Sequence, residues 1–147
     1  MIRRVGQSPE RGQPYRLRHG VYALLPAPGG LLVTLQQEPE PELQLPGGGV
    51  DPGESPLRAL YREVMEETGW SIAAPRRIGA FRRFVYMPEY DMWAEKLCAI
   101  YAARPVRQIC DPTEPGHMPL IIDAATAARE LGNEGDRMFV KRWARRA

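Results

Sequence analysis

Apolar and polar positions alternate partly over residues 15–25, a pattern that predicts a β-strand. Residues 15–25 place Leu17, Val21, Ala23 and Leu25 on one parity, and the apolar segment 31–35 follows a Pro/Gly-rich turn at 26–30. These two segments predict a hairpin. A short strand is expected at 43–45, and longer strands at 78–86 and 95–103 with a loop at 87–93 between them.

The pattern changes to a helical period over residues 56–68. Ser55 can cap the free amides, Pro56 suits the first helical position, and Gly69 suits a left-handed stop. At about 100° per residue, one apolar stripe forms on this helix, and we expect it to face the core. The stripe consists of Leu57, Leu60, Tyr61, Val64 and Thr68.

The last third of the chain predicts a loop at 104–119, a strand at 120–122 and two helices. Asp123 caps the first helix, which runs to Leu131 and ends at Gly132, and the second begins at Asn133. Strands, a helix, more strands and two helices predict an α/β fold with a mixed sheet between helical layers. The 147 residues are enough for one domain, which we place at 15–147 after a flexible N-terminal arm at 1–14.

Composition narrows the function only slightly. The net charge of +2 is too small to indicate nucleic-acid binding. The N-terminus lacks the apolar run of a signal peptide, and no stretch of 18 apolar residues occurs, so a cytoplasmic location without membrane contact is expected. Cys98 and Cys110 form no C-x-x-C pair, and we interpret both as buried free thiols.

Candidate chemistry lies on the predicted helix at 56–68. Glu63, Glu66 and Glu67 fall on one flank at i,i+3 and i,i+4 spacing, where like charges repel. Three glutamates alone are also typical of a solvated acidic face. However, carboxylates at this density suit Mg²⁺ or Mn²⁺, and the bare backbone of the glycines that precede the helix, Gly47 and Gly48, can approach a metal or phosphate closely.

The segment 48–70 resembles the Nudix box. Gly48 is followed after five residues by Glu54, after seven more by Arg62-Glu63-Val64, and then by Glu66-Glu67 and Gly69-Trp70 at one-residue spacings. The resemblance to the Nudix (MutT-like) family implies an α/β/α sandwich with a mixed sheet. It also implies Mg²⁺-dependent hydrolysis of a phosphoanhydride bond in a nucleoside diphosphate linked to another moiety.

The same resemblance implies roles for individual residues. Glu63, Glu66 and Glu67 would be metal ligands, together with the backbone carbonyl of Gly47 or Gly48, and Arg62 would orient the glutamates. Relatives often take the general base from a loop outside the box, and Glu114 is our first candidate. The further candidates for the general base are Glu89, Asp91, Glu95 and Asp111. His117 could act as an acid or base near neutral pH, but we expect a surface position for it.

The sequence leaves the substrate open among nucleoside triphosphates, dinucleoside polyphosphates, ADP-ribose and nucleotide sugars. Tyr86 stands sixteen residues after Trp70, where relatives that hydrolyse diadenosine polyphosphates have a tyrosine. With Tyr90 and Trp93 it could stack on a base, although packing in the core or at the pocket rim suits each of the three at least as well.

Two other functions use the same fold. A non-catalytic nucleotide-binding module would usually have lost box glutamates, which this chain keeps, and neither cysteine supports an isomerase. We expect a small nucleotide-type substrate and no nucleic-acid partner except an RNA 5′ end. A homodimer remains open.

Overall fold

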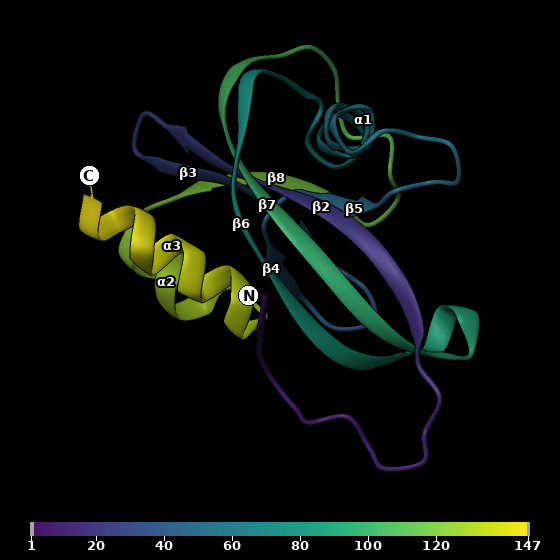
Figure 1. Ribbon diagram of the computed structural model, residues 1–147. Helices are drawn as coiled ribbons and strands as arrows, with labels where there is room; N and C mark the ends of the chain where they lie inside the picture. Colours follow the sequence, from purple (N-terminus) through teal and green to yellow (C-terminus); the bar gives the residue numbers. More distant parts are fainter. Residues whose placement is uncertain (1, 147) are drawn as a thin grey trace.

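The computed structural model describes residues 2–146 and consists of one mixed β-sheet system with three α-helices and a 3₁₀ turn (Figure 1). The strands are β1 (Arg3–Arg4), β2 (Arg16–Ala27), β3 (Gly30–Gln36), β4 (Glu42–Gln44), β5 (Gly47–Gly49), β6 (Trp70–Met87), β7 (Met92–Gln108) and β8 (His117–Ile122). The helices are α1 (Pro56–Thr68), η1 (Pro88–Tyr90), α2 (Ala124–Glu130) and α3 (Glu134–Arg146). No helix within 2–146 is both long enough and apolar enough to span a membrane.

The sheet has the order β1-β6-β7-β2-β3-β4, with β5 also pairing with β2 and β8 with β3. The long β6–β7 pair is antiparallel, whereas β2 lies parallel to β7 with Arg16 opposite Ala94 and Leu24 opposite Ala102. The sheet is therefore mixed, as predicted. The hairpin of β2 and β3 is also confirmed by the pairing of Leu25 with Leu32.

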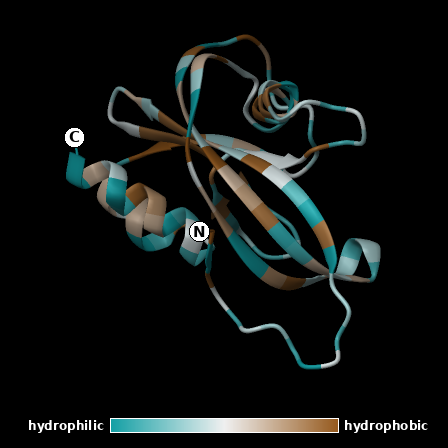
Figure 2. Cartoon of the chain, viewed as in Figure 1, coloured by the Kyte–Doolittle hydropathy of each residue, from teal (hydrophilic) through white to brown (hydrophobic). Residues whose placement is uncertain are grey.

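The helices lie in two layers on either side of the sheet (Figure 1). Leu60 and Val64 of α1 pack on β2 residues such as Val21 in one core cluster. Phe139 and Val140 of α3 pack with Phe81 in a second cluster. Figure 2 shows apolar colours along the strands where they pass between the helices. The expected α/β/α sandwich is confirmed.

Helix α1 begins and ends where the sequence predicts, but its buried face differs from the predicted stripe. The Ser55 side chain accepts a hydrogen bond from the Arg58 N–H, and Gly69 adopts φ 75°. Leu60, Val64 and Thr68 are buried, but Leu57 and Tyr61 are exposed. Their assignment to the core was wrong because α1 turns its Ala59 side toward the sheet, and Ala59 is fully buried.

Several segments differ from the expected elements. Arg3–Arg4 form β1 beside β6, and Val5 is buried, so the start of the expected arm at 1–14 is attached to the sheet. Gly47–Gly49 form a strand that glycines do not signal. β6 and β7 extend well beyond the predicted strands because each provides the other's pairing partner. Cys98 is buried as expected, but Cys110 is exposed.

Candidate functional site

The site begins at the glycine strand β5, which runs antiparallel to β2 with Gly48 opposite Val21. The Glu63 carboxylate of α1 lies directly against this backbone. A Cβ atom added at Gly48 would lie 2.5 Å from Cδ of Glu63. The absence of a side chain at Gly48 therefore lets the Glu63 carboxylate rest on the main chain, at a backbone where the sequence led us to expect a metal or a phosphate.

Arg62 connects the acidic groups of this region. Its Nε and Nη2 donate to the two carboxylate oxygens of Glu54 at 2.7 and 2.9 Å, and Nη1 donates to Glu63 and Glu66 at 2.9 Å each. Nη2 also donates to the carbonyl of Gly49 at 3.1 Å. These contacts lower the pKa of Glu54 to about 2, chiefly through its hydrogen bond to Arg62. The planar guanidinium thus holds three glutamates in fixed positions.

Glu67 is the most deeply placed carboxylate of the group. It is buried, and its Oε1 accepts a hydrogen bond from the Gly47 N–H at 3.0 Å. Burial raises its pKa to about 8, and the nearby charges of Glu63 and Glu114 add to the rise while the Gly47 hydrogen bond opposes it. A carboxylate in this position gains most from an added positive charge.

His117 lies beside Glu67, a position that the sequence did not predict. Its Nε2 is 3.6 Å from Glu67 Oε2, and its Nδ1 shares a 3.0 Å hydrogen bond with Thr34 Oγ1. Only 9% of the side chain is exposed, so the expected surface position was wrong. Burial lowers the pKa of His117, which favours the neutral ring. His117 is buried because β8 pairs with β3, and this pairing places the histidine in the site.

The structure separates the candidates for a general base. Glu114 lines the same pocket as Glu67, and its backbone N–H donates to the Glu66 carbonyl at 2.8 Å, which fastens its loop to α1. Glu89 lines the pocket only at its far end, on η1. Asp91 is hydrogen-bonded to Tyr86, and Glu95 pairs with Arg82 at 3.3 Å. Asp111 is exposed and does not line the pocket.

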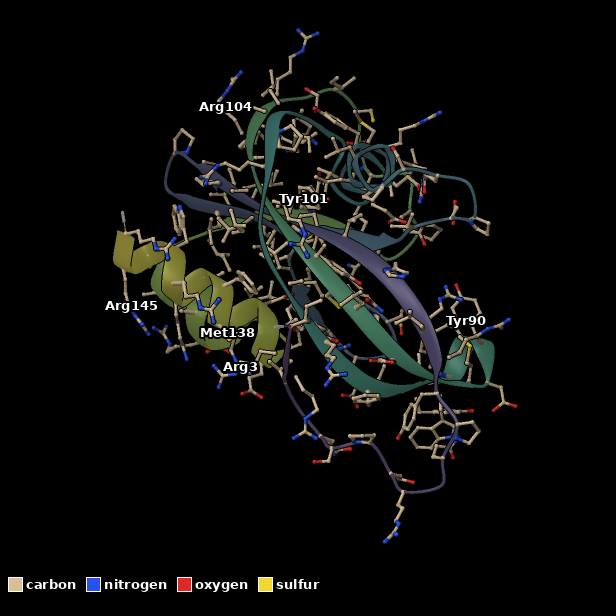
Figure 3. All side chains as sticks on the ribbon, viewed as in Figure 1. Arg3, Tyr90, Tyr101, Arg104, Met138 and Arg145 are labelled. Carbon is tan, nitrogen blue, oxygen red and sulfur yellow. The ribbon has the colours of Figure 1, made fainter. Side chains whose placement is uncertain are left out.

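These groups border a pocket of about 560 Å³. Glu67, Glu114, His117 and the β5 glycines form one end, and η1 forms the other. Tyr86 and Tyr90 line the pocket, and Figure 3 shows Tyr90 on the η1 turn. Trp93 does not line it, because its ring packs against Tyr15 and Tyr86 at centroid distances of 6.0 and 5.2 Å. Glu63 and Glu66 are not among the residues that line the pocket.

Other pocket residues were missed because long-range pairing brings them together. They are Arg18, Arg83, Lys96, Asn133 and Asp136. Asn133 carried a local signal as the start of α3, and its side chain accepts a hydrogen bond from the Asp136 N–H at 2.8 Å. The other four residues carried no local sequence signal that would place them in a pocket.

The donor set fits a divalent cation. The oxygens of Glu63, Glu66 and Glu67 and the β5 carbonyls are the type of ligand that Mg²⁺ prefers, and the pKa of Glu67 is raised by burial first and by the neighbouring negative charges second. Within residues 2–146, no three acidic, histidine or cysteine side chains converge as a completed metal site. Arg62 holds Glu63 and Glu66 instead.

Comparisons with known proteins agree with this geometry. The family model described as "NUDIX domain" matches residues 14–119. A Bacillus subtilis (strain 168) protein named "Putative 8-oxo-dGTP diphosphatase" is 31% identical over 99 residues, which are 62% of each chain. A Halorhodospira halophila protein named "RNA pyrophosphohydrolase" is 41% identical over 56 residues, 38% of this chain and 31% of that protein. The matches thus span less than two thirds of these relatives.

Solved structures share the fold at low sequence identity. A structure described as "NUDIX hydrolase from Nitrosomonas europaea" superposes with a TM-score of 0.73 at 17% identity, covering 88% of this chain and 90% of that one. A MutT protein from Bacillus halodurans gives a TM-score of 0.69 at 20% identity, covering 84% and 80%. At these identities the likeness supports the fold alone.

Proposed function

Because the chain belongs to the Nudix family, we propose that it is a Mg²⁺-dependent hydrolase of a phosphoanhydride bond in a nucleoside diphosphate derivative. The observation that carries the proposal is the carboxylate cluster of α1 beside the β5 glycines: Arg62 holds Glu63 and Glu66, and Glu67 lines one end of a pocket large enough for a nucleotide. Nucleoside triphosphates, dinucleoside polyphosphates, ADP-ribose and nucleotide sugars are the candidate substrates. The names of the two relatives add 8-oxo-dGTP and RNA, of which the 5′ end is the part with the matching chemistry.

Glu63, Glu66 and Glu67 would hold the metal, with a carbonyl of Gly47 or Gly48. Bound there, Mg²⁺ would neutralise charge on phosphate oxygens and lower the pKa of a water molecule. Arg62 keeps two of these carboxylates oriented through 2.9 Å hydrogen bonds. The backbone N–H of Gly47 fixes Glu67 in the same way. This pre-set arrangement costs no reorganisation during the reaction.

Glu114 would take a proton from the attacking water. Its loop is anchored to the Glu66 carbonyl through the N–H groups of Thr113 and Glu114, at 2.9 and 2.8 Å, so the base moves with the helix that carries the metal ligands. The side chain remains exposed and lines the pocket, which gives it access to both water and substrate. A general base in such a position typically contributes 10²–10⁴-fold to the rate.

A phosphate-release screen with Mg²⁺ tests the proposal. It covers the four substrate classes, 8-oxo-dGTP and a 5′-triphosphorylated RNA, with wild type, Glu66→Gln and Glu130→Gln. Glu130 is an exposed glutamate of α2, and serves as the matched control. We expect Glu66→Gln to abolish turnover with an unchanged melting temperature and Glu130→Gln to retain it.

Full Mg²⁺-dependent activity of Glu66→Gln would refute the assignment of the ligands. No turnover of any substrate by wild type, combined with nucleotide binding, would instead support a non-catalytic binding module.

A further inference from the structure

Three positively charged side chains lie in a line across neighbouring strands of the pocket wall. Arg83 of β6 is opposite Lys96 of β7, and Lys96 is opposite Arg18 of β2. All three side chains line the pocket. Since neighbouring strands are about 4.8 Å apart, the three charges follow one another at close spacing. We call these residues the cation row.

The cation row is electrostatically unfavourable on its own, because like charges directly opposite each other on paired strands are destabilising. Within residues 2–146, none of its members forms an ion pair within 4.0 Å. The Arg18 guanidinium lies over the Tyr90 ring at 5.0 Å. Burial lowers the pKa of Lys96, and the charge of Arg83 lowers it further. The row therefore gains from a negatively charged ligand.

Two carboxylates on the same pocket wall offset part of this charge. Asp136 of α3 is fully buried, and Glu89 lies on η1. Both attract Lys96, but neither contacts the row closely enough to pair with it. Asp136 accepts a hydrogen bond from the Leu45 N–H at 3.4 Å instead. The other carboxylates that line the pocket, Glu42, Glu67 and Glu114, lie on β4, on α1 and in the loop before β8, so the positive charge of the pocket is concentrated at the cation row.

The row lies at a defined distance from the glutamate end of the pocket. Gly49 is opposite Gly20, which is opposite Cys98, two residues from Lys96. Strand spacing and rise per residue place Lys96 roughly 12 Å from Gly49. This exceeds the span of a diphosphate, whose phosphorus atoms share one oxygen. Arg18 bridges the interval, since its Nη2 would lie 3.8 Å from a Cβ added at Gly49.

We propose that the cation row binds a second phosphate group, carried on the 2′ or 3′ position of the ribose of the nucleotide whose 5′-diphosphate lies at the glutamate end. The proposal rests on the proposed function and deepens it by naming a substrate class. Arg83 supplies a planar fork that matches a phosphate bidentately, and Lys96 supplies a point charge. A ribose phosphate of a free nucleotide and the first phosphodiester of a nucleic-acid strand share this chemistry.

Binding of non-hydrolysable probes tests the proposal separately from catalysis. Calorimetry at low salt compares AMP with adenosine 2′,5′-bisphosphate, adenosine 3′,5′-bisphosphate and the 5′-phosphorylated dinucleotide pApA, with the guanosine equivalents in parallel. Wild type should bind at least one of the doubly phosphorylated probes about tenfold or more tightly than the monophosphate. If pApA binds as tightly as the 3′,5′-bisphosphate, the second phosphate is the first phosphodiester of a nucleic-acid strand. If pApA binds more weakly, the second phosphate belongs to a free nucleotide.

Variants assign the effect to the row. Lys96→Met and Arg83→Met should each bring the affinity ratio close to one. The matched control is Arg82→Met, next to Arg83 on β6 but exposed on the opposite face, where Arg82 pairs with Glu95 at 3.3 Å. This control should keep the ratio. Lys96→Gln replaces Lys96→Met if the latter fails to fold.

Three outcomes would overturn the inference. The first is that wild type binds the monophosphate and the doubly phosphorylated probes equally tightly, and the second is that it binds none of them at millimolar concentration. A lowered melting temperature of Lys96→Met with an unchanged affinity ratio would show that the row only offsets Asp136. Failure of the proposed function looks different, because the affinity ratio would persist while no substrate is hydrolysed.

Discussion

Replacing Arg62 with lysine keeps the positive charge beside the glutamates but removes the planar fork that orients them. Arg62 donates to both oxygens of Glu54 and, through Nη1, to Glu63 and Glu66, all at 2.7–2.9 Å. Lysine has three donors on one nitrogen atom and cannot span these positions. We expect Glu63 and Glu66 to lose their fixed orientation.

The stability of the fold should change little. The Arg62 side chain is 31% exposed and Glu66 29%, so solvent screens their interaction, and the variant should lose about 1 kcal/mol or less of unfolding free energy. The effect on catalysis should be much larger. A misplacement of reacting or metal-holding groups by about 1 Å costs on the order of 100-fold in rate, and we expect kcat to fall by about this factor.

Initial rates at saturating Mg²⁺ measure this effect, with a separate Mg²⁺ titration for the apparent metal affinity. The matched control is Arg58→Lys, an exposed arginine one turn earlier in α1 whose backbone N–H, rather than its side chain, bonds to Ser55. The control should keep wild-type kcat. If Arg62→Lys stays within threefold of wild type in both kcat and Mg²⁺ affinity, Arg62 does not position the glutamates.

Three further predictions concern other parts of the site and fold. Glu114→Gln should lower kcat by about 10²–10⁴-fold, whereas the exposed loop control Asp111→Asn should not. Gly69→Ala adds a Cβ 1.8 Å from a loop carbonyl at φ 75°, so thermal melting should show a loss well above the about 1–2 kcal/mol of Gly53→Ala, which has φ 77° and open space. Burial raises the pKa of Asp136 from 3.8 to about 6, so the folded state binds the proton more tightly, and about 3 kcal/mol of stability should disappear as pH rises through the interval from 3.8 to 6. Asp136→Asn should remove that loss in urea unfolding, and an unchanged pH dependence would contradict it.

The sequence predicted the parts of the structure that depend on local signals. Ser55 and Gly69 defined α1 correctly because a cap and a left-handed stop act within one turn of the chain. Arg62 and Glu66 contact each other at 2.9 Å, and their i,i+4 spacing is also a local feature that places both side chains on one helix face. By contrast, the exposure of Leu57 depends on how α1 is rotated against the sheet, and the helical period alone does not fix that rotation.

The ends of the strands were missed for a different reason. β6 passes through Ala74 at φ 53° and through several register shifts, and no alternation of apolar residues survives there. Pairing with β7 nevertheless extends the strand from Trp70 to Met87. His117 was misplaced for the same reason, since its burial follows from β8 pairing with β3 rather than from the neighbouring sequence.

The cation row depends on register in the same way. A shift of β7 by one residue would turn Lys96 to the other face of the sheet, because side chains alternate along a strand. The same register places Gly20 opposite Cys98. A Cβ atom added at Gly20 would lie 2.9 Å from the Tyr22 ring, so the position beside the row has no side chain. The position of the Lys96 charge therefore depends on the β2–β7 register, whereas the space at Gly20 depends on the absence of a side chain on β2. A substitution that shifts β7 should displace the charge, whereas Lys96→Met should remove it without changing the register.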